Sequence, residues 1–104
     1  MISIMNESDF DENSNKMIAV KFWASWCGPC NMVKPSIDRM EKEFDNVDFI
    51  SIDVDQVPSL AKKYKVKSLP SLLLIKDGSE INRLNGAVLI DPMRKAFQDL
   101  TKTE

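Results

Sequence analysis

The chain contains two cysteines, and they lie three positions apart in the segment Cys27-Gly28-Pro29-Cys30. At this spacing the two sulfurs can close a small disulfide ring. The thiolate of one cysteine can also attack an outside disulfide while the other waits within reach. The segment follows an apolar run and stands where a helix is expected to begin. Thiol–disulfide exchange is therefore the first chemistry that the sequence suggests.

Other uses of a cysteine pair fit the composition less well. A tetrahedral zinc site needs two further sulfur or nitrogen ligands, whereas the chain has no third cysteine and no histidine. A metal shared between two chains stays an alternative. A purely structural disulfide gains little from so small a ring. The absence of histidine also excludes Ser-His-Asp and Cys-His hydrolases. We therefore expect a redox pair without a bound metal.

The position of each sulfur predicts its role. If Cys27 lies at the N-terminal edge of a helix, the free N–H groups and the positive helix end favour its thiolate. Cys30, one turn further in, is expected to be more shielded and less acidic. We therefore expect Cys27 to attack and form a mixed disulfide, which Cys30 then resolves. Pro29 stiffens the turn between them, and Gly28 leaves space for a partner chain.

Length and composition suit one domain that spans residues 1–104. With 43% hydrophobic and 29% charged residues, the chain is typical of a globular protein with one modest core. Its net charge of −2 is too small to argue for nucleic acid or an anionic membrane as a partner. Residues 1–7 do not resemble a secretory signal, and the longest apolar run, Leu72–Ile75, is too short to cross a bilayer. We therefore expect a cytoplasmic protein.

Hydrophobic periodicity predicts an alternation of strands and helices around the cysteines. Met17–Ala24 is nearly continuous in apolar residues, as in a strand buried on both faces, and it leads directly into the cysteine segment. The expected strands are Ile2–Met5, Met17–Ala24, Val47–Val54, Ser71–Lys76 and Ile81–Leu84, the last two joined by an Asp77-Gly78 turn. The expected helices are Ser8–Asn13, Pro29 to Glu43, Pro58–Tyr64 and a final one capped by Asp91 and begun by Pro92. This order predicts an α/β fold, in which helices cover both faces of a central mixed sheet.

The segment from Phe22 to Cys30 resembles the signature of the thioredoxin family, and the similarity extends from about Met17 to Leu100. Further matches are dispersed along the chain: Asp53-Val54-Asp55, Leu69-Pro70-Ser71, Lys76-Asp77-Gly78 and Gly86. The resemblance implies a thioredoxin fold, with Pro70 as a cis proline that faces the cysteines. Leu69 would then offer its backbone N–H and C=O to a client segment as a short extra strand. Trp26, Leu69, Gly86 and Ala87 would form an apolar rim around Cys27, whereas Trp23 is expected in the core.

Lys21 departs from the family pattern. Thioredoxins typically carry a buried aspartate at this point of the strand, where it helps to move the proton of the resolving thiol. Two alternatives follow for the lysine. It either extends its ammonium group to the surface, or it lies near the sulfurs and tunes the pKa of a thiol there.

By resemblance, the expected activity is that of a protein-disulfide reductase that contributes to cell redox homeostasis. The resemblance implies a monomer without a bound cofactor, which receives electrons from NADPH through a flavin-containing thioredoxin reductase and passes them to disulfide-containing client proteins. A disulfide isomerase or oxidase is one alternative. A binding or scaffold module with a secondary redox role is another.

Overall fold

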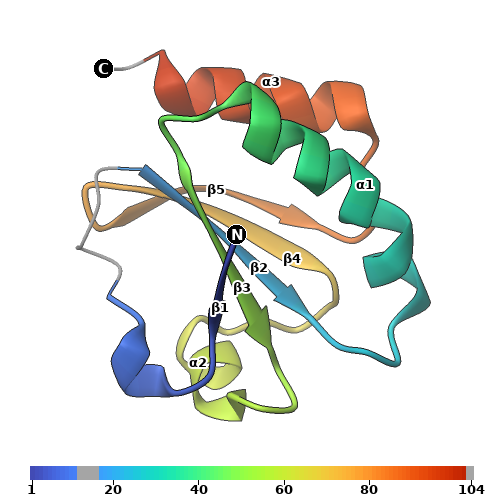
Figure 1. The fold of residues 1–104 in the computed structure, drawn as a ribbon, viewed down its shortest axis with the longest axis vertical. Helices are drawn as coiled ribbons and strands as arrows, with labels where there is room; N and C mark the ends of the chain where they lie inside the picture. The colour runs from blue at the N-terminus through green and yellow to red at the C-terminus, as the bar shows by residue number, and fades with distance from the viewer. Residues whose placement is uncertain (12–16, 103–104) are drawn as a thin grey trace.

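The computed structural model describes residues 1–11 and 17–102, which form a five-stranded sheet and three α-helices (Figure 1). The strands are β1 (Ile2–Ile4), β2 (Met17–Trp23), β3 (Asp48–Asp53), β4 (Ser71–Lys76) and β5 (Ser79–Asn85). The helices are α1 (Gly28–Glu43), α2 (Pro58–Lys63) and α3 (Ile90–Thr101), and a 3₁₀ helix, η1, spans Glu7–Asp9. No helix among the described residues is long and apolar enough to cross a membrane.

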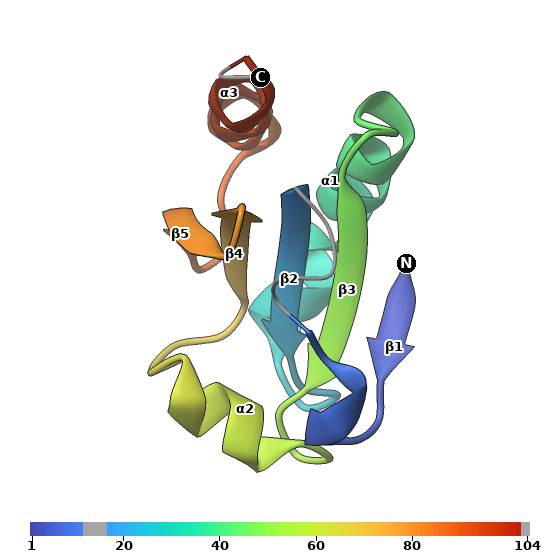
Figure 2. The same cartoon turned by 90° about the vertical axis from the view of Figure 1, so that its left-hand side faces the viewer.

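The strand order is β1-β3-β2-β4-β5, which can be followed from right to left in Figure 2. Strands β1, β3 and β2 run parallel to one another, whereas β4 is antiparallel to both β2 and β5. The predicted mixed sheet is confirmed. The buried strand β2 occupies its centre, so the segment that carries the cysteines emerges from the most enclosed part of the sheet.

Alternate side chains of β2 separate the core into two layers. Met17 and Ala19 pack with apolar residues of α1 and α3 on one face of the sheet. Ile18, Val20 and Phe22 pack with the α2 side on the other face. Figure 1 shows α1 and α3 next to each other, with α2 at the opposite end of the view. Helices therefore cover both faces, as predicted.

The turn between β4 and β5 has the predicted form. Asp77 and Gly78 adopt φ values of 52° and 80°, and Lys76 pairs directly with Ser79 across the hairpin. Positive φ at both central residues is what a two-residue type I′ turn requires, and an Asp-Gly pair adopts it readily. The paired strand β5 is longer than predicted, because residues on both sides of Ile81–Leu84 join the ladder.

The predicted start of the last helix is wrong. Helix α3 begins at Ile90, and its N-cap is Leu89, which makes no side-chain capping bond. Asp91 lies inside the first turn, where its carboxylate accepts a hydrogen bond from Arg94 instead of capping the helix. Pro92 fits two positions into the helix because the first N–H groups of a helix have no intrahelical partner.

Near the N-terminus, the predicted helix Ser8–Asn13 is replaced by η1 at residues 7–9. Residues 12 and 13 of that prediction lie outside the described residues.

Candidate active site

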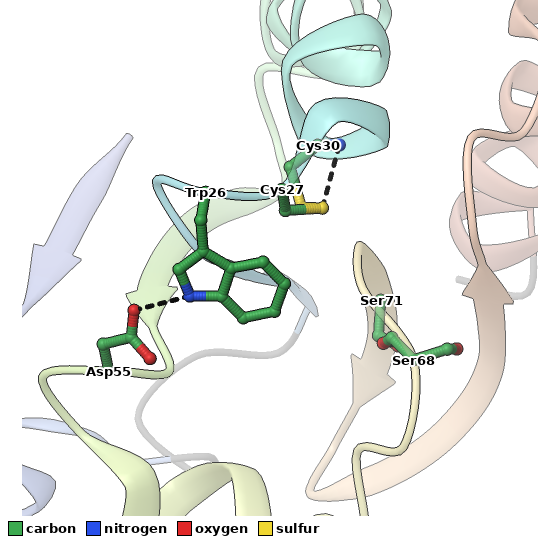
Figure 3. The surroundings of a disulfide bond; sticks show 6 residues. All are labelled: Trp26, Cys27, Cys30, Asp55, Ser68 and Ser71. Carbon is green, nitrogen blue, oxygen red and sulfur yellow. Dashed lines mark hydrogen bonds between the residues drawn. A yellow bond between two sulfur atoms is a disulfide. The ribbon is translucent and has the colours of Figure 1, made fainter.

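Cys27 and Cys30 form a disulfide at the start of α1, with their Cα atoms 5.3 Å apart. Cys27 is the N-cap of the helix, and its Sγ accepts a hydrogen bond of 3.2 Å from the backbone N–H of Cys30 (Figure 3). Pro29 occupies the first turn, where its missing N–H leaves no helical hydrogen bond unmade. The predicted position of Cys27 at the N-terminal edge of a helix is confirmed, and donors there favour a negative sulfur.

We expected Cys30 to be more shielded than Cys27, but the two are buried to the same extent. The exposed fraction is 5% for Cys27 and 4% for Cys30. Both side chains pack with Ala24 and with the partly buried Trp23 and Leu69. Cys27 is therefore less exposed than its expected attacking role suggested. The two residues differ in a way that exposure does not measure, because each borders a different cavity.

Cys27 borders an apolar groove of about 530 Å³ that lies between the start of α1 and the loop before β4. Its lining consists of Trp26, Cys27, Gly28, Pro29, Val54, Ala61, Val66, Lys67, Ser68 and Leu69. Four of the expected client contacts, Trp26, Gly28, Pro29 and Leu69, are thus brought together at Cys27. The other three, Pro70, Gly86 and Ala87, are not part of this lining. A Cβ placed on Gly28 would meet no atom within 4 Å, so this position does leave open space.

The side chain of Trp26 is 69% exposed, and Asp55 holds its ring in place. The indole Nε1 donates a hydrogen bond of 2.8 Å to the Asp55 carboxylate (Figure 3). Asp55 itself is oriented by a bond of 2.9 Å from its backbone N–H to the side chain of Asp53. In the sequence, Asp55 stands out only as part of the family match Asp53-Val54-Asp55, which predicts no role for its side chain. The available signal was its place just after β3, because parallel β2 and β3 end at the same edge of the sheet.

The loop before β4 lies across the groove from the cysteines, and Leu69 packs against them. The Leu69–Pro70 peptide bond is cis, as the family resemblance implied. The carbonyl of Pro70 accepts a bond of 2.8 Å from the N–H of Gly86, which joins the two expected client-contact segments. The Ser71 hydroxyl donates to the carbonyl of Ser68 at 2.7 Å. Within the described residues, neither the N–H nor the C=O of Leu69 has a hydrogen-bond partner.

Cys30 borders a second cavity, of about 280 Å³, on the α1 side of the sheet. Its lining consists of Met1, Ser3, Lys21, Trp23, Cys30, Asn31, Lys34, Asp38 and Ser51. Trp23 is only partly buried, so its expected place in the core is corrected to the edge of this cavity. Its Nε1 is nevertheless buried and has no hydrogen-bond partner among the described residues.

Lys21 lies in this second cavity and is 7% exposed, so it does not extend freely into solvent. Its Nζ sits 5.6 Å from the centre of the Trp23 ring. Burial lowers the pKa of Lys21 below its ordinary value, and the nearby Lys34 lowers it further, whereas Asp38 and Glu41 oppose the shift. This burial argues against a lysine that extends freely into solvent, and the shared cavity brings Lys21 to the side of the sheet that Cys30 borders. That Lys21 tunes the pKa of a thiol stays a prediction.

Comparison with known proteins agrees with this geometry. The family model described as Thioredoxin matches residues 1–99. The chain belongs to the thioredoxin family. It is 47% identical over 76 residues to Thioredoxin H2 of Arabidopsis thaliana, a match that covers 73% of this chain and 57% of that protein. It is 39% identical over 82 residues to Thioredoxin-1 of Saccharomyces cerevisiae, covering 77% of this chain and 80% of that one.

Solved thioredoxin structures share the whole fold. The thioredoxin of Plasmodium falciparum superposes with a TM-score of 0.89 at 28% identity, covering 95% of this chain and 98% of that one. The thioredoxin of Fasciola hepatica superposes with a TM-score of 0.87 at 34% identity, and the match covers 97% of this chain and 100% of that one. Some curated relatives are longer: the matched region spans 57%, 51% and 66% of three of them. The predicted thioredoxin fold is confirmed, and the family match together with the disulfide between Cys27 and Cys30 supports dithiol–disulfide exchange.

Proposed function

We propose that this thioredoxin-family chain is a protein-disulfide reductase, with Cys27 as the attacking thiol and Cys30 as the resolving thiol. The observation that carries the proposal is that the two joined cysteines border different cavities: Cys27 caps α1 beside an apolar groove, and Cys30 borders the cavity on the α1 side of the sheet. A client in the groove would reach Cys27 first. Cys30 would stay next to the same sulfur, ready for the second step.

The exchange transfers two electrons. The Cys27 thiolate attacks one sulfur of a client disulfide, forming a bond between Cys27 and the client and releasing the other client sulfur as a thiolate. The Cys30 thiolate then attacks the sulfur of Cys27. The Cys27–Cys30 bond forms, the bond to the client breaks, and the second client sulfur leaves as a thiolate. The client is reduced to a dithiol, while the cysteine pair is oxidised to the disulfide.

Client binding is assigned to the groove and its neighbours. Trp26, Gly28 and Pro29 offer an apolar surface with room above Gly28. The N–H and C=O of Leu69, which have no partner in the part of the chain that the structure describes, would pair with the client backbone. Such pairing gives binding that depends little on client sequence. Pro70, Gly86 and Ala87 complete the assigned contact surface. The hydrogen bond from Gly86 to Pro70 supports this grouping, although these residues lie beyond the groove lining.

We extend the proposal to the compartment, the oligomeric state and the electron donor of the chain. The chain would act as a cytoplasmic monomer of one domain without a bound cofactor, reduced by thioredoxin reductase with electrons from NADPH. One similar structure, at 30% identity and a TM-score of 0.88, comes from work on thiol resolution in a yeast mitochondrial 1-Cys peroxiredoxin through the glutathione and thioredoxin systems. It supports peroxiredoxins as one class of client.

Insulin reduction by the purified chain, with thioredoxin reductase and NADPH supplied, tests this function. We expect turnover by the wild type and no turnover by Cys27→Ser or Cys30→Ser. A covalent client adduct should accumulate with Cys30→Ser and not with Cys27→Ser, which assigns the two roles. A wild-type chain that leaves insulin oxidised would reject the reductase. A partner complex that survives both substitutions would then favour the scaffold alternative.

A further inference from the structure

Lys21 is a buried cation in the cavity beside Cys30, and the charged groups around it are already paired with other partners. The charged groups that face Lys21 come from α1, which supplies Lys34, Asp38 and Glu41, and from the amino group of Met1 at the start of β1. Lys34 pairs with Asp38 at 3.2 Å, and the Met1 amino group pairs with Glu41. Both acidic groups therefore already have a cationic partner. Within the described residues, Lys21 itself forms no ion pair, although it lines the same cavity as Cys30.

The remaining cavity groups do not supply the missing anion. Ser51, which pairs with Lys21 in the β2–β3 register, is uncharged, and so is Asn31. Trp23 presents its ring face to the ammonium group, a contact that favours the charged form of the lysine. The buried Nε1 of Trp23 adds another donor without an acceptor among the described residues. The one group lining this cavity that can still become anionic is the sulfur of Cys30, once the disulfide is reduced.

We infer that the Lys21 ammonium group is the counter-charge of the Cys30 thiolate and so accelerates the resolving step. This inference rests on the proposed reductase function and deepens it. Lys21 is a positioning residue in this scheme, because it acts through Cys30 and forms no bond with the client. The proton of the Cys30 thiol passes to solvent, since the exposed Asn31 and Lys34 also line this cavity. The thiolate then attacks Cys27 as described above.

The linkage is reciprocal. A cation beside Cys30 lowers the pKa of its thiol, and a thiolate beside Lys21 raises the pKa of the amine. Burial lowers the Lys21 pKa while the sulfurs are joined and no thiolate is present. Reduction would therefore give the buried ammonium group of Lys21 an anionic partner, the Cys30 thiolate.

A direct test titrates Cys30 alone. The Cys27→Ser chain keeps Cys30 as its single thiol, whose ultraviolet thiolate absorbance is followed against pH with and without Lys21→Met. We expect the substitution to raise the Cys30 pKa by about one unit, which is about tenfold less thiolate at neutral pH. Lys21→Arg, which keeps the charge, should restore most of the shift. This measurement needs neither client nor reductase, so it stays decisive if the wild type fails to reduce insulin.

The matched control is Lys63→Met. The Nζ of Lys63 also lies 5.6 Å from an aromatic ring, that of Tyr64, but on the α2 side and away from the cavity that Cys30 borders. Removing this charge should leave the Cys30 titration unchanged. An equal shift with Lys63→Met would assign the effect to overall charge and overturn the inference. Thermal unfolding of each variant checks folding, and Lys21→Met should fold because it replaces a buried charge with an apolar side chain of similar length.

A kinetic test separates the two steps in the chain that keeps both cysteines. Stopped-flow mixing with a fluorescent peptide disulfide should give two phases, formation and release of the mixed disulfide. Lys21→Met should slow release about tenfold at neutral pH and leave formation unchanged. The difference should vanish at high pH, where Cys30 ionises without help. Equal release rates across the pH range, together with an unchanged Cys30 titration, would overturn the inference.

Discussion

The indole of Trp26 and the carboxylate of Asp55 are joined by a 2.8 Å hydrogen bond across 29 positions of sequence. The bond fixes the large exposed ring at the mouth of the groove that Cys27 borders. A ring held in one orientation loses less conformational freedom when a client binds. We therefore expect Asp55 to contribute to client binding through Trp26.

Replacing Asp55 tests this contact. Asp55→Ala should lower kcat/KM for a protein disulfide about threefold to fivefold, the effect of losing roughly 1 kcal/mol from one hydrogen bond. Asp55→Asn keeps an acceptor oxygen and should retain more activity. The melting temperature should change little in either variant, because both partners are exposed. Equal kcat/KM for Asp55→Ala and the wild type would show that the ring needs no anchor.

Two glycines near the site should respond differently to alanine. Gly86 has a φ of +80°, which L side chains rarely adopt, although a Cβ there would meet no atom within 4 Å. Gly86→Ala should therefore cost about 1 to 2 kcal/mol of unfolding free energy through the backbone alone. Gly28→Ala lies at the helix start in open space and should keep its stability while reducing client turnover. Urea unfolding measures the stability of the two variants, and insulin reduction measures their turnover. An unchanged urea midpoint for Gly86→Ala would show that the positive φ at this position costs alanine nothing.

The ring of Phe97 anchors α3 to the sheet. It is fully buried and stacks on Phe44 and Phe49, with both pairs of ring centres 5.3 Å apart. Phe97→Ala should lower the unfolding free energy by about 3 to 5 kcal/mol, since it removes apolar contact and leaves a cavity. Ile81→Ala, at a residue 53% exposed on β5, should cost under about 1 kcal/mol. Denaturant unfolding measures both, and similar losses would show that the stack is not a centre of the core.

Acid should weaken the link between α1 and α3. Arg94 donates two hydrogen bonds, of 2.8 and 2.9 Å, to the carboxylate of Glu43, and this lowers the Glu43 pKa from 4.5 to about 2. Because the folded pKa is depressed, the stabilisation is present above about pH 4.5 and is lost as the pH falls toward 2. The melting temperature of the wild type should exceed that of Glu43→Gln at neutral pH, and the two should converge at low pH.

The control for this pH dependence is Glu7→Gln, because Glu7 is exposed and forms no ion pair within the described residues. Its melting temperature should follow that of the wild type at every pH. A gap between Glu43→Gln and the wild type that stays constant down to pH 2 would contradict the depressed pKa.

Local patterns were enough to predict most elements and the reactive pair. The apolar run of β2, the helical spacing after Pro29 and the Asp77-Gly78 turn each report on neighbours along the chain, and each is confirmed. The start of α3 was mispredicted because an aspartate before a proline can either cap a helix or lie in its first turn. Only the path of the chain before Ile90 distinguishes these cases.

The sequence alone was sufficient for the cysteine spacing, the cap position of Cys27 and the presence of a lysine on the central strand. The tertiary structure decided that Cys27 faces one cavity and Cys30 another, that Asp55 holds Trp26, and that Lys21 is left without an ion pair among the described residues. The physical reason is the distance along the chain over which each kind of information acts. Periodicity identifies which face of an element is buried, whereas strand order and helix placement decide which distant side chains meet there.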